Sequence, residues 1–387
     1  MAELRFMTAG ESHGPCLTAI LEGMPAGLEL RKEAIDRDLA RRQQGYGRGG
    51  RMKIEQDHVE ILSGVRFGET IGGPITLSVR NRDWENWTDR MAVFGEPSGP
   101  KVTAARPGHA DLTGLKKYGR RDVRDILERS SARETTMRVA VGGICKEFLR
   151  ECGIEVVSHV TMIGGISVDP GKIDSAVIGA AESELNCCDR EAEERMKECI
   201  RSAKEQGDTL GGVFEVIARN VPLGLGSHIQ WDRRLDARLA AAMMSIQAVK
   251  GVEIGAGFTC AELPGSRIHD EMYLDENKHV YRKTNRAGGL EGGMSNGEEI
   301  LIRAAMKPIP TLMQPLHSVD VERREEVLAC KERSDTCAVS AASVVGEAMT
   351  AFVLAQALVE KFGGDAMVDL LSALEAYKNR VADWWGK

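Results

Sequence analysis

Apolar residues recur at helical spacing in several long segments of the chain. In KEAIDRDLARR, residues 32–42, Ile35 and Leu39 stand four positions apart, which predicts an amphipathic helix. The same spacing runs from Met137 to Phe148. Further helices are predicted for residues 234–249, for residues 338–362 and for a last segment that ends at Tyr377, and the charge-rich segment 183–208 predicts a solvated helix.

Strand-like segments stand between these helices without strict alternation. The first 30 or so residues are expected to form short strands around glycine turns, and residues 59–62, 75–79 and 213–218 (VFEVIA) are further predicted strands. This order predicts an α/β (α+β) fold and does not imply a single doubly wound parallel sheet. No low-complexity linker interrupts the chain, so we expect one intertwined domain over residues 1–387.

Composition narrows the class of protein. The chain has 387 residues, of which 42% are hydrophobic and 28% charged, enough for a large core. No apolar run is expected to approach the ~18 residues that span a bilayer, and the N-terminus lacks a signal sequence, so we expect a cytoplasmic protein without a membrane partner. The 9 cysteines include no Cys-x-x-Cys pair, which argues against disulfides and a metal site.

The arginine-rich stretch RRQQGYGRGGR, residues 41–51, stands out in a chain whose net charge is -7. Its segment GYGRGG matches the dinucleotide-binding pattern G-x-G-x-x-G, but that pattern needs a strand before it and a helix after it. Here a predicted helix comes first, so the match is rejected. The glycines permit close backbone approach, and guanidinium groups bind phosphate and carboxylate in bidentate fashion.

Other predicted loops add cations beside small or rigid residues. They carry Arg106 and His109, Arg129 and Arg133, Lys307, and Arg333 with Asp335. A solvated surface patch is the alternative for any single arginine, but several such loops together predict a concave anion site. Nucleic acid is not expected as the partner, because the chain is acidic overall, has only 5% aromatic residues and shows no continuous basic stripe.

Three residues are candidates for proton chemistry. His13 in GESHGP and His109 in RPGHAD stand in Gly/Pro turns, where functional loop residues concentrate; the alternative is a surface turn residue. Asp335 precedes a predicted helix and has a plain N-cap as its alternative. LERSSARE and KERSDTCA, residues 127–134 and 331–338, share Glu-Arg-Ser before long helices, which indicates either an internal duplication or two ordinary caps.

Nine motifs, in chain order, closely resemble those of the chorismate synthase family: GESHGP, RRQQGYGRGGRMKIE, RPGHADL, ERSSARETTMRVAVG, GDTLGG, SIQAVKG, GGLEGGMSNG, MKPIPTL and ERSD. The resemblance implies a β-α-β sandwich with internal pseudo-symmetry, assembled as a homotetramer. It also implies a carbon-oxygen lyase that converts 5-enolpyruvylshikimate 3-phosphate to chorismate and phosphate by 1,4-elimination. That reaction is the last common step of the shikimate pathway toward aromatic amino acids, and it requires reduced FMN without net oxidation.

The resemblance also implies roles for individual residues. His13 would protonate the departing phosphate, His109 would donate to the flavin near N1/O2, and Asp335 would be the partner of flavin N5, which removes the C6 proton. The substrate's phosphate and carboxylates would be bound by Arg42, Arg48, Arg51, Arg133 and Arg333. The flavin would be contacted by Arg129, Ser130, Ser131, Gln247, Ala248, Gly292, Lys307, Pro308, Ile309, Pro310, Thr311 and Arg333.

Some questions stay open at the level of sequence. Gln247 stands where many relatives have asparagine, although both amides offer the same donor and acceptor. The flavin could be reduced by the protein itself with NADPH or by an external flavin reductase. A non-catalytic phosphate- or nucleotide-binding protein on the same scaffold, and a flavin-dependent redox enzyme, are the competing functions.

Overall fold

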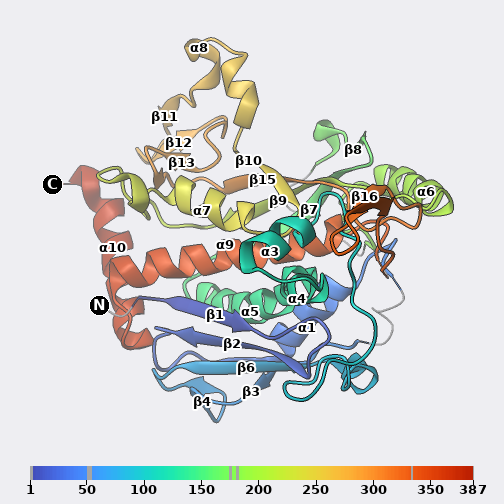
Figure 1. Ribbon diagram of the computed structural model, residues 1–387. Helices are drawn as coiled ribbons and strands as arrows, with labels where there is room; N and C mark the ends of the chain where they lie inside the picture. Colours follow the sequence, from blue (N-terminus) through green and yellow to red (C-terminus); the bar gives the residue numbers. More distant parts are fainter. Residues whose placement is uncertain (1–2, 50–54, 174–176, 180–182, 333, 387) are drawn as a thin grey trace.

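Two antiparallel sheets enclose a layer of helices in the computed structural model, which describes residues 3–49, 55–173, 177–179, 183–332 and 334–386 (Figure 1). The first sheet has the strand order β1 (Arg5–Ala9), β2 (Cys16–Glu22), β6 (Ile75–Arg80) and β3 (Glu60–Ile61). The second has the order β10 (Val249–Ile254), β15 (Ile300–Met306), β9 (Gly212–Arg219), β7 (Glu155–Ile163) and β8 (Ile166–Ser167).

Long helices fill the space between the sheets. The helix α5 (Thr135–Glu151) packs on β2 and β6, and α9 (Val339–Phe362) packs on β7 and β9. The two helices contact each other, with α1 (Lys32–Gln43) against both and α7 (Leu235–Met244) between α9 and β10. The predicted β-α-β sandwich is therefore confirmed, and each half pairs one sheet with one long helix that follows a Glu-Arg-Ser segment.

The other α-helices and β-strands lie outside the two sheets and the central helices. They are α3 (Asp111–Tyr118), α4 (Arg124–Ser130), α6 (Arg190–Glu205), α8 (Gly265–Ile268), α10 (Met367–Ala382), β4 (Val65–Arg66), β5 (Glu69–Thr70), β11 (Met272–Leu274), β12 (Val280–Arg282), β13 (Leu290–Glu291), β14 (Met294–Ser295), β16 (His317–Asp320) and β17 (Glu325–Leu328). Most of the buried apolar residues that the structure describes, from Leu4 to Leu374, form one cluster that joins both sheets to the helices, and two smaller clusters surround Leu115 and Val157.

Two expectations from the sequence need correction. The helix α9 is long and apolar enough to cross a membrane by length and composition, contrary to the expectation that no such run exists, but 94% of its most apolar window is buried inside the protein. A helix that is apolar all round fits a core position of this kind. The charged segment 183–208 is not wholly solvated, because α6 begins after its N-cap Asp189 and buries the stripe Ala192, Met196, Ile200 and Ala203.

Candidate active site

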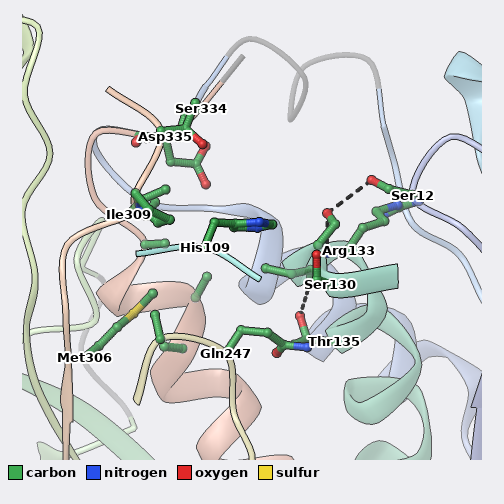
Figure 2. Close-up of a pocket in the computed structure, with 18 of the residues that line it drawn as sticks. Ser12, His109, Ser130, Arg133, Thr135, Gln247, Met306, Ile309, Ser334 and Asp335 are labelled. Atoms are coloured by element: carbon green, nitrogen blue, oxygen red, sulfur yellow. Dashed lines mark hydrogen bonds between the residues drawn. The ribbon is translucent and has the colours of Figure 1, made fainter. Parts of the chain in front are cut away.

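A cavity of about 680 Å³ lies where the loop after α1, the N-terminal ends of α5 and α9, the α7–β10 connection and the end of β15 meet. Figure 2 shows His109, Gln247, Ile309 and Asp335 arriving from different segments around the same space. The predicted site residues that line this cavity are His13, His109, Asp335, Arg42, Arg48, Arg133, Ser130, Ser131, Gln247, Ala248, Lys307, Ile309, Pro310 and Thr311.

Of the other predicted residues, the three that the structure describes, Arg129, Gly292 and Pro308, are not among the residues that line the cavity. Arg129 is exposed, and its guanidinium donates hydrogen bonds of 2.8 and 2.6 Å to the carbonyl and hydroxyl oxygens of Thr8. Gly292 lies in the turn of the β13–β14 hairpin, and Pro308 is exposed beside Lys307. Arg51 and Arg333 lie outside the described residues.

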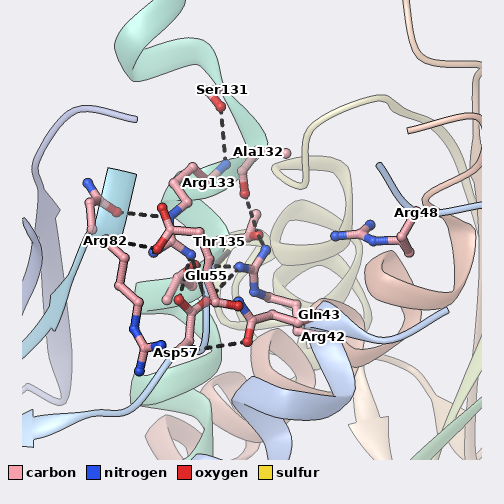
Figure 3. A network of polar contacts seen from close by, with 12 residues as sticks. Arg42, Gln43, Arg48, Glu55, Asp57, Arg82, Ser131, Ala132, Arg133 and Thr135 are labelled. Carbon is pink, nitrogen blue, oxygen red and sulfur yellow. Dashed lines mark hydrogen bonds and ion pairs between the residues drawn. The ribbon is translucent and has the colours of Figure 1, made fainter. Parts of the chain in front are cut away.

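Arg42 and Arg133 share a buried carboxylate (Figure 3). Asp57 accepts hydrogen bonds of 3.0 Å from Arg42 and of 2.7 and 2.8 Å from Arg133. Burial lowers the pKa of Arg42 to about 10. The positive charges of Arg133 and Arg48 also lower this pKa, whereas the negative charge of Asp57 raises it. Burial acts to raise the pKa of Asp57, but the two arginines outweigh it and hold that pKa below its ordinary value. The cluster therefore stays fully ionised and fixes both guanidinium groups.

Two guanidinium nitrogens of this cluster make no hydrogen bond in the part of the chain that the structure describes. Arg42 Nε and Arg133 Nη2 are buried and have no hydrogen-bond acceptor among the described residues, although Arg133 Nη2 lies 3.6 Å from a carboxylate oxygen of Glu55. A buried donor without an acceptor is costly, so the rest of the fold must compensate for these two nitrogens.

His13 is held by a carboxylate and an aromatic ring. Its Nδ1 lies 2.9 Å from Glu128 Oε1, its backbone N–H donates to Glu128 Oε2 at 2.8 Å, and its ring stacks on Trp87 at 4.0 Å between centroids. Burial acts to raise the pKa of Glu128, but its bonds to His13 and to Arg124 lower it. An ionised Glu128 thus orients the imidazole toward the cavity side of α4.

His109 is held in the same manner. Its Nδ1 contacts the buried Asp111, which also accepts a hydrogen bond of 2.8 Å from Arg106 Nε. Burial opposes ionisation of Asp111, yet its bonds to His109 and Arg106 hold its pKa well below the usual range. Arg106 also donates to Thr311 at 3.1 Å, which links this turn to the loop after β15.

Asp335 connects the glycine-rich loop to the start of α9. Its Oδ1 accepts a hydrogen bond of 2.6 Å from the backbone N–H of Gly49, and its Oδ2 lies 3.0 Å from Arg48 Nη1. A Cβ at position 49 would stand 3.0 Å from the carbonyl oxygen of Ser334, so glycine permits this approach. The N-cap alternative for Asp335 is wrong, because α9 begins at Val339 after Ala338. By contrast, Ser131 does cap, accepting from Arg133 N at 3.3 Å.

Comparison with known proteins agrees with this geometry. The chorismate synthase family model matches residues 4–359. The chain belongs to the chorismate synthase family. Curated relatives named chorismate synthase include one from Geobacter sulfurreducens, 58% identical over 389 residues with 98% of this chain and 99% of the relative covered. Another, from Aquifex aeolicus, is 59% identical over 390 residues, with 98% of both chains covered.

A solved structure leads to the same family. The structure titled "Crystal Structure of Chorismate Synthase" superposes with a TM-score of 0.78 at 48% identity, covering 98% of each chain. The fold of this family is thus shared along nearly the whole chain.

Within this family member, one side of the cavity is suited to a planar organic group. Apolar side chains there include Ile246, Met306, Ile309 and Val345. Gln247 donates to Glu134 at 3.0 Å, while its Oε1 is buried without a hydrogen-bond donor among the described residues. A flavin offers ring N–H groups and a broad apolar face, so the residues present fit the cofactor implied for the family.

Several supporting residues were missed by reasoning from sequence. Asp111 stands two positions after His109, and Glu128 is the glutamate of the first Glu-Arg-Ser segment, so both carried a local signal. Asp57 and Trp87 carried none, because only the folded chain places them against Arg42, Arg133 and His13.

Proposed function

We propose that this cavity is the active site at which the chain converts 5-enolpyruvylshikimate 3-phosphate to chorismate and phosphate. One carbon–oxygen bond to phosphate and one carbon–hydrogen bond break, a carbon–carbon double bond forms, and no net oxidation occurs, as for a carbon-oxygen lyase. The observation that carries the proposal is the convergence of His13, His109 and Asp335 with three arginines on one cavity of a chorismate synthase fold.

The arginines are proposed to bind the substrate's anionic groups. Arg42, Arg48 and Arg133 line the cavity, and guanidinium groups bind phosphate and carboxylate through paired hydrogen bonds. Arg51 and Arg333 are proposed to join them. His13, oriented by Glu128, is proposed to protonate the phosphate as it leaves, a role in which a positioned imidazole contributes roughly 10²–10⁴-fold.

Reduced FMN is proposed as the cofactor, held against the apolar side by Ser130, Ser131, Gln247, Ala248 and the segment from Lys307 to Thr311. When bound, it supplies electron density to the substrate as phosphate departs. His109, fixed by Asp111, is proposed to donate a hydrogen bond to the cofactor's N1/O2 edge. Asp335 is proposed to be the partner of the cofactor's N5 and to accept the proton that N5 carries. The cofactor contacts of Arg129, Pro308, Gly292 and Arg333 stay predictions.

The test is an anaerobic reaction of purified protein with photoreduced FMN and the substrate, without nicotinamide. We expect chorismate and phosphate to appear in equal amounts, with reduced flavin needed in catalytic quantity only. Binding of both ligands without product would instead favour the non-catalytic binder, and NADPH consumption in proportion to product would favour a redox enzyme.

The wider assembly is also a proposal. We propose that the chain acts as one catalytic domain in a cytoplasmic homotetramer, which sedimentation analysis would test by a mass of four chains. NADPH oxidation by the purified protein with FMN would distinguish its own flavin reduction from reliance on an external reductase.

A further inference from the structure

A cluster of three reactive groups lies on the face of the second sheet that points away from α9. Ser158 on β7 reaches Glu347 of α9 with a hydrogen bond of 2.6 Å, so the next residue, His159, points to the opposite face. Glu215 on β9 stands directly across from His159 in the strand register. Cys188 approaches the same ring from the segment before α6.

The three side chains form a chain of hydrogen bonds. Cys188 Sγ lies 3.4 Å from His159 Nδ1, and His159 Nε2 lies 3.2 Å from Glu215 Oε1. A carboxylate can only accept, so Nε2 keeps its proton and Nδ1 is directed at the sulfur. Nδ1 can then take the thiol proton and afterwards donate to the thiolate, which is the arrangement of nucleophile, base and orienting acid.

The backbone on both sides of Cys188 is fixed, so the contact is not a chance rotamer on a loose loop. The Asn186 carbonyl accepts from Val160 N at 2.8 Å, and its amide donates to Ser343 Oγ at 2.9 Å. Cys187 N donates to Ser183 Oγ at 2.8 Å. Asp189 caps α6 through hydrogen bonds from Glu191 N and Ala192 N.

The hydrogen bonds of His159 favour the protonated form of its ring. Burial disfavours the charged ring, but its hydrogen bonds with Cys188 and Glu215 outweigh burial and raise the pKa of His159 to about 9. From β15, Arg303 Nε lies 3.9 Å from Glu215 Oε2. On the α6 side, Glu193 and Asp189 act to raise the thiol pKa of Cys187, and both carboxylates accept backbone hydrogen bonds.

The neighbouring residue Cys187 is more deeply buried than Cys188, and its thiol is harder to deprotonate than an ordinary one. Burial raises the pKa of Cys187 to about 12, and its sulfur donates to the Asp189 carbonyl at 3.4 Å. Cys188 is only partly buried, although it packs against the apolar cluster of Val157, Ile178 and Ile217.

We propose that Cys188 is a nucleophilic thiol, activated by His159 and oriented through Glu215, and that it forms a modification site for small soft electrophiles outside the active-site cavity. In the reaction with iodoacetamide, His159 takes the thiol proton, the sulfur forms a bond to carbon, the carbon–iodine bond breaks and iodide leaves. The thiolate is the reacting species, so the rate follows the thiolate fraction.

The experiment compares alkylation rates of Cys188 and Cys260 in the intact protein between pH 5 and pH 9, each assigned by peptide fragmentation. Cys260 is exposed and is the internal control. We expect Cys188 to be alkylated at least about tenfold faster than Cys260 at pH 6, and the Cys188 rate at that pH to fall about tenfold in His159→Gln, since one unit of pKa is a tenfold change in thiolate.

Glu215→Gln should shift the Cys188 profile in the same direction as His159→Gln but less, while the Cys260 profile stays unchanged in both variants. The proposal is overturned if Cys188 follows the profile of Cys260, or if it is not alkylated at any pH. Should a variant fail to fold, as judged by circular dichroism, the two profiles within the unaltered protein decide the matter alone.

Discussion

At the residue scale, a carboxylate fixes four of the functional side chains that line the cavity. Asp57 holds Arg42 and Arg133, Glu128 holds His13, and Asp111 holds His109. Burying such pairs is costly in desolvation, so they are weak candidates for stabilisation as such. Their consequence is positional, because the groups that would contact the ligand are oriented before it arrives.

Replacing the proposed acid tests this at His13. We expect His13→Ala to lower kcat about 10²–10⁴-fold, the usual contribution of a positioned acid. The profile of kcat/KM against pH should be bell-shaped in the unaltered enzyme and lose its basic limb in the variant. His58→Ala is the matched control, since His58 is exposed and, among the residues that the structure describes, pairs with Asp36 alone, at 3.2 Å. An unchanged basic limb would remove His13 from this role.

Asp57→Asn tests the buried cluster. The variant removes the charge that two buried guanidinium groups share, and breaking a buried ion pair typically costs about 3–5 kcal/mol. We expect a lower urea midpoint and a higher KM for the phosphorylated substrate. Glu22→Gln, in the exposed pair with Arg5, should leave both values unchanged. If Asp57→Asn and Glu22→Gln have the same urea midpoint and the same KM, Asp57 is not needed to hold the two guanidinium groups.

The low pKa of Asp57 predicts how stability depends on pH. Its pKa is depressed in the folded state, so its contribution is fully present above the unfolded value of about 4 and is lost as pH falls through the folded value. We expect the free energy of unfolding to fall below about pH 4, and to fall less steeply in Asp57→Asn because one such carboxylate is missing. Denaturation at fixed pH values from 6 to 3 measures this slope.

At the element scale, the long helices could be predicted from the sequence and the pairing of elements could not. Local periodicity places Ile35 and Leu39 on one face of α1, and it marks α5 from Met137 to Phe148. The strand β3 is shorter than its apolar pattern, and the buried stripe of α6 is hidden among charges. For the site, His13 and His109 could be predicted because each stands in a Gly/Pro turn. Asp57 could not, because only long-range packing brings it to Arg42 and Arg133.

The crossing of α5 and α9 depends on a glycine. A Cβ at Gly142 would stand 2.5 Å from the Cα of Ala348, whereas one at Gly143 would meet Ile35 at 3.1 Å. We therefore expect Gly142→Ala to destabilise the protein by about 1–3 kcal/mol through overpacking, despite the better helix propensity of alanine. Gly143→Ala should cost less. Urea unfolding of both variants measures the two losses of free energy of unfolding. A larger loss in Gly143→Ala than in Gly142→Ala would contradict the close packing of α5 on α9 at Gly142.

At the scale of the whole molecule, the cavity lies where both halves of the sandwich contribute. The N-terminal ends of α5 and α9, which follow the two Glu-Arg-Ser segments, meet the loop after α1 and the end of β15 around it. The resemblance to one family could be read from motifs in the sequence. That their residues surround a single space follows only from the packing of α5 against α9.

A ligand in that cavity should therefore stabilise the entire fold. We expect the midpoint of thermal unfolding to rise more with FMN and 5-enolpyruvylshikimate 3-phosphate together than the sum of the rises with either alone, because each would complete the other's site. At a free ligand concentration of 100 times Kd, binding adds about 2.7 kcal/mol. Arg48→Ala should abolish the excess, since Arg48 lines the cavity and pairs with Asp335, whereas the exposed Arg323→Ala should keep it. Strictly additive shifts in the unaltered protein would mean that cofactor and substrate bind independently, and the shared cavity would then lose its role as one site for both.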